Sequence, residues 1–175
     1  MASHVALLRG INVGGRAKVP MAELRDIVTS LGWQDVATYL NSGNLLFTPP
    51  ASVPETELAT KLTEALGARL GFAPPVLVRT TPELVRAARF CREVFPDAPD
   101  KATAIAFLSD EPAQAADDLL VRIEEDHHGC ERAVALHFPK GQGQSRLDAA
   151  RLERLLGVTV TVRGILTVEG LIQRF

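Results

Sequence analysis

The segment VATYLNSGNLLFT, residues 36–48, decides how this chain is expected to fold. Val36–Leu40 reads as a strand, and Asn41–Asn44 has the composition of a tight turn. Leu45–Thr48 is then the returning strand, closed by Pro49 and Pro50. The segment therefore predicts a β-hairpin.

A strand and a helix are expected on each side of this hairpin. His4–Leu8 is a short apolar strand, and a helix opens at Pro20 and ends at Gly32. After the hairpin, Pro54–Leu70 carries leucines at every fourth position, which predicts a helix, and Val76–Arg79 is a further strand. The order strand, helix, strand, strand, helix, strand is that of the ferredoxin-like split unit.

The second half of the chain repeats this order of elements without repeating the sequence. A connecting helix is expected from about Pro82, and the elements expected after it are a strand at Thr103–Leu108, a helix at Pro112–Ile123, strands around Glu124–His127 and Ala133–Phe138, a helix at Ser145–Leu156 capped by Ser145 with Asp148, a strand at Val158–Val162 and a short helix at Thr167–Gln173. We therefore predict an α+β fold, a tandem pair of ferredoxin-like βαββαβ units with antiparallel sheets and a C-terminal helix. The first unit spans residues 1–80, the connecting helix and linker 81–101, and the second unit 102–175.

Composition limits the classes of function. The chain has 175 residues and a net charge of -2, so no global charge favours binding to nucleic acid or to an anionic membrane. We expect neither a secretion signal nor a bilayer-spanning segment, because no apolar run approaches the roughly 20 residues required. Cys91 and Cys130 lie in unrelated contexts and are expected to be reduced thiols. The sequence thus predicts a cytoplasmic protein.

Two polar, glycine-rich corners are the candidate binding sites. Strands joined by a crossover helix run parallel, so the loop after the first strand should meet the hairpin turn. The first corner would combine Arg9, Gly10, Asn12, Gly14, Gly15 and Lys18 with Asn41, Ser42, Gly43 and Asn44. Cations, amides and free N–H groups suit a phosphate or carboxylate. Alternatively, the glycines only permit tight turns and the asparagines only cap backbone.

The second corner follows the third strand of the second unit. It comprises Lys140, Gly143, Ser145 and Arg146, and it is expected to cluster with Arg163 at the end of the last strand. An anion could bind there at a helix N-terminus. A common turn before a capped helix is the alternative.

Several established motifs are absent from the sequence. The glycine spacing fits neither the Walker A nor the Rossmann pattern, and no G-x-S-x-G elbow occurs. His127–Cys130 (HHGC) lacks partners to complete a metal site, and a hairpin turn is the preferred interpretation. We therefore predict no metal and no cofactor, and no catalytic residue can be assigned.

The motifs nevertheless resemble a family. LLRGINVGG (7–15), KVPMAELR (18–25) and TYLNSGNLLF (38–47) look like the N-terminal signature of a bacterial family catalogued as domain of unknown function 1697, and FPKGQGQSRL (138–147) is similar to its glycine-serine loop. The resemblance implies a tandem ferredoxin-like, cytoplasmic protein without an established activity. The family usually has Asn-Trp-Asn-Thr after the last strand, whereas this chain has Gly164–Thr167 (GILT).

Three functions stay open at this point. The leading hypothesis is a small-molecule-binding protein for an anionic or phosphorylated ligand, or an enzyme whose reaction the sequence does not reveal. The alternative is a protein-interaction or self-associating regulatory module, with a homodimer as the partner. RNA binding is disfavoured, because the predicted sheet offers only Phe47 for base stacking.

Overall fold

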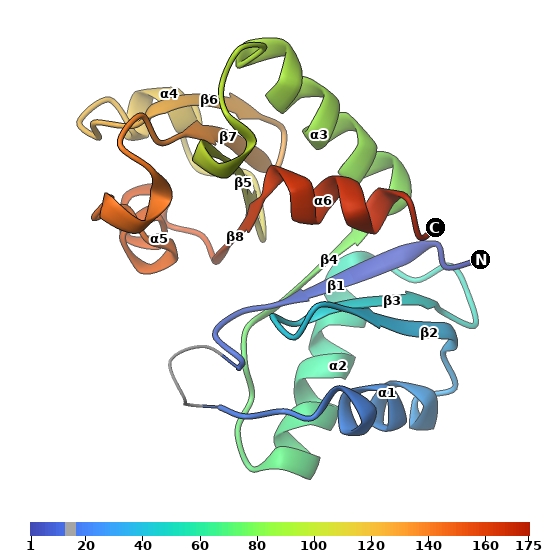
Figure 1. The fold of residues 1–175 in the computed structure, drawn as a ribbon. Helices are drawn as coiled ribbons and strands as arrows, with labels where there is room; N and C mark the ends of the chain where they lie inside the picture. The colour runs from blue at the N-terminus through green and yellow to red at the C-terminus, as the bar shows by residue number, and fades with distance from the viewer. Residues whose placement is uncertain (13–16) are drawn as a thin grey trace. The chain divides into compact units, whose positions relative to one another are not determined.

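The computed structural model describes residues 1–12 and 17–175, and this part of the chain divides into two compact units (Figure 1). Unit 1 comprises Met1–Thr81 with Arg174–Phe175, and unit 2 comprises Pro82–Gln173. The described residues form two four-stranded antiparallel sheets and six α-helices. The predicted α+β class and the antiparallel sheets are thereby confirmed.

Unit 1 contains the hairpin from which the sequence analysis began. Its elements are β1 (His4–Leu8), α1 (Met21–Ser30), β2 (Gln34–Tyr39), β3 (Asn44–Thr48), α2 (Glu55–Leu70) and β4 (Val76–Thr80). The sheet has the order β2-β3-β1-β4. Because β3 is antiparallel to both β1 and β2, the latter two run in the same direction. The loop after β1 and the turn between β2 and β3 therefore emerge at the same end of the sheet.

The core of unit 1 lies between one face of the sheet and the two helices (Figure 1). The apolar positions of α1 and α2 face this sheet, where the leucines at fourfold spacing in α2, Leu58, Leu62 and Leu66, are at most 1% exposed. Trp33 stacks on Phe47 with ring centroids 4.2 Å apart. Burial of these side chains contributes most of the favourable free energy of folding.

The strands and helices of unit 2 follow one another in the same order as those of unit 1. Additional helices precede and follow them in the sequence. Its elements are α3 (Thr81–Val94), which continues from the last residue of unit 1, the 3-10 helix η1 (Asp100–Ala102), β5 (Thr103–Leu108), α4 (Ala116–Leu119), β6 (Asp126–Cys130), β7 (Ala133–His137), the 3-10 helix η2 (Gln142–Gln144), α5 (Ala149–Leu156), β8 (Val160–Gly164) and α6 (Ile165–Ile172). The sheet order is β6-β7-β5-β8. Leu152 and Leu156 of α5 pack on Leu136 and its neighbours to form the core.

The structure differs from the sequence prediction in the middle of unit 2. The helix expected at Pro112–Ile123 is the single turn α4, which begins after Ala115, a residue that cannot provide a side-chain cap. The HHGC segment is not a hairpin turn but belongs to β6, and the turn lies at Glu131 and Arg132. Glu131 adopts a φ of 50°, in the left-handed region that such a turn requires.

The predicted start of α5 was also wrong. Ser145 has an extended backbone conformation and precedes the helix, which begins at Ala149. Asp148 is the N-cap, and its Oδ1 accepts a hydrogen bond from the Arg151 N–H at 2.7 Å. Ser145 is therefore free to bond elsewhere, as described below.

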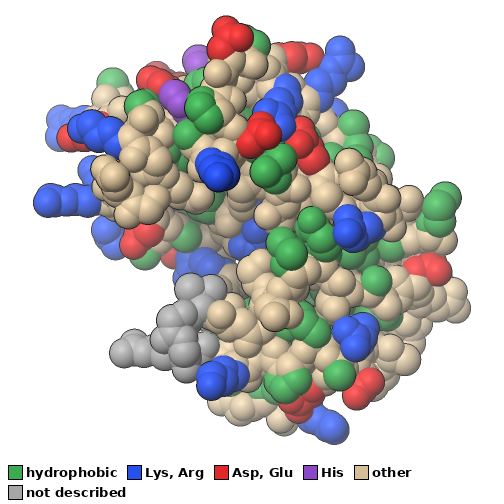
Figure 2. Space-filling model, viewed as in Figure 1, with side chains coloured by type: hydrophobic (Ala, Val, Ile, Leu, Met, Phe, Trp, Pro, Cys, Tyr) green, Lys and Arg blue, Asp and Glu red, His purple; other side chains and the backbone are tan. Residues whose placement is uncertain are grey.

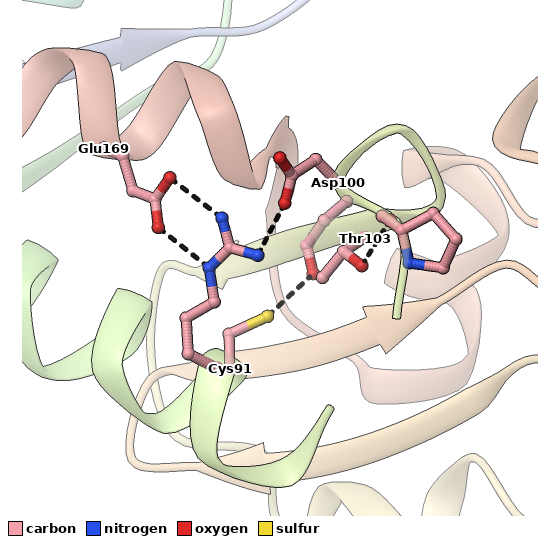
Figure 3. Close-up of polar contacts among 7 residues, drawn as sticks. Cys91, Asp100, Thr103 and Glu169 are labelled. Carbon is pink, nitrogen blue, oxygen red and sulfur yellow. Dashed lines mark hydrogen bonds and ion pairs between the residues drawn. The ribbon is translucent and has the colours of Figure 1, made fainter. Parts of the chain in front are cut away.

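An ion-pair cluster joins α3 to α6 within unit 2 (Figure 3). Arg92 donates two hydrogen bonds of 2.9 Å to the Glu169 carboxylate and one of 2.6 Å to Asp100. The hydrogen bonds to Glu169, and then the one to Asp100, hold the pKa of Arg92 above its ordinary value. Because all three side chains are partly exposed, this cluster fixes geometry more than it adds stability.

Cys91 should react with thiol reagents far more slowly than Cys130. Cys91 is fully buried, and burial raises the pKa of its thiol to about 11. The thiolate is the reactive form, so we expect labelling of the folded protein by a disulfide reagent at least about tenfold slower at Cys91 than at Cys130, with the Cys91 rate still rising up to about pH 11. Single Cys→Ser variants separate the two rates, and urea should equalise them. Equal rates in the folded protein would contradict this account.

Candidate functional site

The two loops of the first corner meet, and Asn12 joins them. Its Nδ2 donates hydrogen bonds to the carbonyl oxygens of Asn41 at 2.8 Å and Val19 at 2.9 Å. Its Oδ1 accepts the Val19 N–H at 2.8 Å. Asn12 itself has a φ of 55°, a conformation that asparagine tolerates better than most residues. The Asn12 amide thus makes three hydrogen bonds within the chain.

Gly43 lies beneath this corner and has no space for a side chain. Its φ is +84°, and an added Cβ would lie 2.9 Å from the Leu8 Cβ and 3.0 Å from the Leu8 oxygen and the Ile11 side chain. The carbonyl of Gly43 accepts the Leu8 N–H at 2.8 Å. Gly43 is therefore required both by the turn and by the close approach of β1.

Other members of the first corner are also held by the chain. Asn44 is fully buried and donates to the Tyr39 carbonyl at 2.9 Å and to Ser42 Oγ at 3.1 Å. The N–H of Arg9 donates to the Pro75 carbonyl at 2.9 Å, and Gly10 is exposed with a φ of 73°. Gly14 and Gly15 lie outside the described residues.

A shallow cavity of about 490 Å³ is present at the first corner. Among the described residues, its lining is Asn12, Lys18, Val19, Pro20, Met21 and Asn41. Lys18 is the single cation in this set, and the Asn12 amide already bonds to the backbone. The described lining of this cavity consequently offers an anion only one cationic side chain.

The second corner contains a cavity with much more positive charge. Its volume is about 520 Å³, and its lining comprises Arg122, Glu124, Glu125, Phe138, Pro139, Lys140, Gly141, Gln144, Ser145, Arg146 and Arg151. Three predicted residues, Lys140, Ser145 and Arg146, are in this set. Four cationic side chains thus surround one cavity with two carboxylates.

Sequence reasoning missed Arg122, Glu124, Glu125 and Arg151, and the sheet register explains how the first three reach the cavity. Asp126 pairs directly with His137 across the β6–β7 hairpin. The segment immediately before β6 must therefore lie beside the segment immediately after β7. A correct prediction of the β6–β7 register would have placed these residues beside the loop after β7.

Ser145 connects these two segments. Its Oγ donates a hydrogen bond to Oε1 of Glu125 and accepts the Leu147 N–H at 2.8 Å. The loop that carries Lys140 and Arg146 is thereby fixed against the residues that precede β6. One wall of the cavity is preorganised by this contact.

Two predicted members of the second corner are not part of this lining. Gly143 lies in η2 and is not among the residues that line the cavity. Arg163, the other one, is likewise not among the residues that line the cavity. The Arg163 guanidinium instead donates to Thr161 Oγ1 at 2.9 Å and to the Val162 carbonyl at 3.1 Å. Burial lowers the pKa of Arg163 to about 10.

The four cations of the cavity outnumber its two carboxylates. Within residues 1–12 and 17–175, none of Arg122, Lys140, Arg146 and Arg151 forms a side-chain ion pair. Figure 2 shows Lys and Arg side chains gathered over the part of unit 2 that carries α5, with some Asp and Glu among them. The chain as a whole has a net charge of -2, so this positive charge is local.

No group of three or more His, Cys, Asp or Glu side chains in the described part of the chain could hold a metal ion. Phe47, the aromatic side chain considered for base stacking, is fully buried under its contact with Trp33. Its ring is therefore not available to a nucleic-acid base. No helix formed by the described residues combines the length and apolarity needed to cross a membrane.

Fold and site together define a class of protein: an α+β chain of two units with a cationic cavity in the second. A family model described as "protein of unknown function (DUF1697)" matches residues 1–134, and the chain belongs to this family. The resemblance inferred from the N-terminal motifs is thus confirmed, while the loop at 138–147 lies beyond the matched residues.

The structure is also similar to a solved one. The conserved bacterial protein SP0830 from Streptococcus pneumoniae superposes with a TM-score of 0.69 at 24% sequence identity, and the match covers 99% of this chain and 98% of that one. At this identity the likeness shows the fold alone. Among curated proteins, no relative matches the chain.

Proposed function

We propose that the protein is a cytoplasmic small-molecule-binding protein whose unit 2 cavity binds an anionic, phosphorylated ligand. The observation that carries the proposal is the set of four cationic side chains around one cavity, none of them in an ion pair within the described residues. Unpaired cations that converge on one space repel one another and are relieved by a bound anion. The proposal covers a binding protein as well as an enzyme that acts on such a ligand.

Size and shape support a small molecule over a macromolecule. A cavity of about 520 Å³ falls in the range of about 300 to 1,000 Å³ that metabolite sites occupy. The contact between Ser145 and Glu125 fixes the loop before any ligand arrives, which lowers the entropic cost of binding. Arginine also binds phosphate through two parallel hydrogen bonds, and three of the four cations are arginines.

We also propose that each unit is a ferredoxin-like unit, which makes the chain a tandem repeat of this fold. The support is the order of elements, strand-helix-strand-strand-helix-strand, in both sheets. The strand orders β2-β3-β1-β4 and β6-β7-β5-β8 are equivalent when the two units are aligned. The two candidate corners then differ in their position within the repeat. The first corner follows the first strand of its unit, and the second corner follows the third strand of its unit.

The double variant Lys140→Ala/Arg146→Ala tests the proposed ligand class. Both side chains are exposed, so the fold should persist. Calorimetric titration with inorganic phosphate, citrate and glycerol 3-phosphate should show saturable binding to the wild-type protein. A hydrogen bond to a charged group contributes about 1.5 to 3 kcal/mol, so the double variant should bind at least about tenfold more weakly.

The matched control is Lys61→Ala/Arg69→Ala, which removes the same charge from exposed positions of α2, outside the cavity lining. Its affinities should stay within about twofold of wild type, because neither side chain can contact a ligand in the cavity. If none of the three anions binds, or if the control loses as much affinity as the cavity variant, the proposed function is wrong.

A further inference from the structure

The two glutamates of the unit 2 cavity are a feature that anion binding alone leaves unexplained. Glu124 and Glu125 line the same cavity as the four cations. An ionised carboxylate only accepts hydrogen bonds, and it repels a phosphate placed beside it. A site for a compact polyanion such as inorganic pyrophosphate would gain affinity if both were neutral.

The carboxylates differ in how they are held. Oε1 of Glu125 accepts the Ser145 hydroxyl, and within the described residues no hydrogen bond involves its Oε2. Glu124 is exposed and makes neither a hydrogen bond nor an ion pair with any described residue. Acceptor oxygens are therefore available on the segment before β6, whereas Lys140 and Arg146 lie on the segment after β7.

We propose, on the basis of the function proposed above, that the ligand is a phosphate ester of a polyhydroxyl compound, such as a sugar phosphate. Its phosphate would be bound by the cations, and its hydroxyl groups would donate to the carboxylates of Glu124 and Glu125. An ammonium group could also donate to these carboxylates. A neutral hydroxyl fits better, because four cationic against two anionic side chains leave the lining positive.

This assignment gives the glutamates a role in specificity. They raise the affinity for a ligand that carries hydroxyl groups next to its phosphate. They lower the relative affinity for phosphates that carry only negative charge or an apolar chain. Discrimination is then expressed as the ratio of two affinities, which a general loss of folding would not change in this way.

The test compares glycerol 3-phosphate with propyl phosphate, which has the same number of carbons and the same phosphate but no hydroxyl groups. Calorimetry on the wild-type chain should show about tenfold tighter binding of glycerol 3-phosphate, as expected for one or two net hydrogen bonds to a carboxylate. In the variant Glu124→Gln this ratio should fall to about threefold or less, while propyl phosphate binds more tightly because a like charge is removed.

Glu111→Gln is the matched control, since it makes the same charge change at an exposed position outside this cavity. It should leave the ratio unchanged. If phosphates bind but the wild-type ratio is near unity, or if Glu124→Gln leaves the ratio intact, the assignment is overturned and anion binding survives. If no phosphate binds at all, both proposals fall together.

Discussion

Replacing Gly43 by alanine should lower the free energy of unfolding of unit 1 by about 3 kcal/mol. A non-glycine residue in the left-handed region contributes about 1 to 2 kcal/mol to this loss, and overpacking contributes about 1 to 3 kcal/mol. The new Cβ would lie 2.9 Å from the Leu8 Cβ and 3.0 Å from the Leu8 backbone oxygen. Leu8 is fully buried in the central strand β1 and cannot move aside without disturbing the sheet.

The measurement can be confined to unit 1, because the single tryptophan, Trp33, is buried there against Phe47. Urea unfolding followed by Trp33 fluorescence gives the midpoint and the slope. Gly71→Ala is the matched control: Gly71 has a similar φ of +75°, but apart from its chain neighbours no atom of the described residues lies within 4 Å of its added Cβ. The control should lose only about 1 kcal/mol. Equal losses at the two glycines would show that the close approach to Leu8 is not a constraint.

The hairpin shows how much of the fold could be predicted from sequence. Asn41–Asn44 has side chains that favour a turn, the flanking residues favour strands, and the observed strands β2 and β3 differ from the prediction only at their ends. Local chemistry and tertiary packing agree here. They disagree in β6, where HHGC lacks strand-forming residues and is held in place by backbone pairing with β7.

The site was harder to predict than the fold, for a geometric reason. The meeting of the two loops at the first corner follows from topology alone, because it requires only that β1 and β2 run in the same direction. The second cavity depends on register: β6 begins at Asp126 rather than Glu124, and this decides which residues lie beside Lys140. β6 has the sequence DHHGC, and the side chains of such a polar, glycine-containing strand specify its register only weakly.

The two corners therefore differ in what their polar residues do. At the first corner, the described amides and turn glycine are engaged by the chain itself, as the contacts of Asn12 and Gly43 show. At the second, the cations have no ionic partner among the described residues. Polar groups that already bond to the chain stabilise the fold, whereas unpaired converging charges are what a ligand can use.

Replacing Asn12 by alanine should lower the free energy of unfolding of unit 1 by about 2 to 3 kcal/mol, because three hydrogen bonds are lost at about 1 kcal/mol each. These bonds join Asn12 to Val19 on its own loop and to Asn41 on the hairpin turn. Val19 is 2% exposed, so water cannot readily replace the amide oxygen at its N–H. Trp33 fluorescence in urea again gives the measurement.

Two further variants separate the causes. Asn12→Gly loses the same hydrogen bonds but tolerates the φ of 55°, so it should be about 1 kcal/mol more stable than Asn12→Ala. Asn12→Asp keeps the acceptor for Val19 but sets a carboxylate against two carbonyl oxygens, which raises its pKa in the folded state. The stability of Asn12→Asp relative to wild type should therefore be greatest below about pH 4 and fall as the pH rises through the folded pKa. If Asn12→Asp matches the wild type at neutral pH, the amide N–H groups do not hold the two loops together.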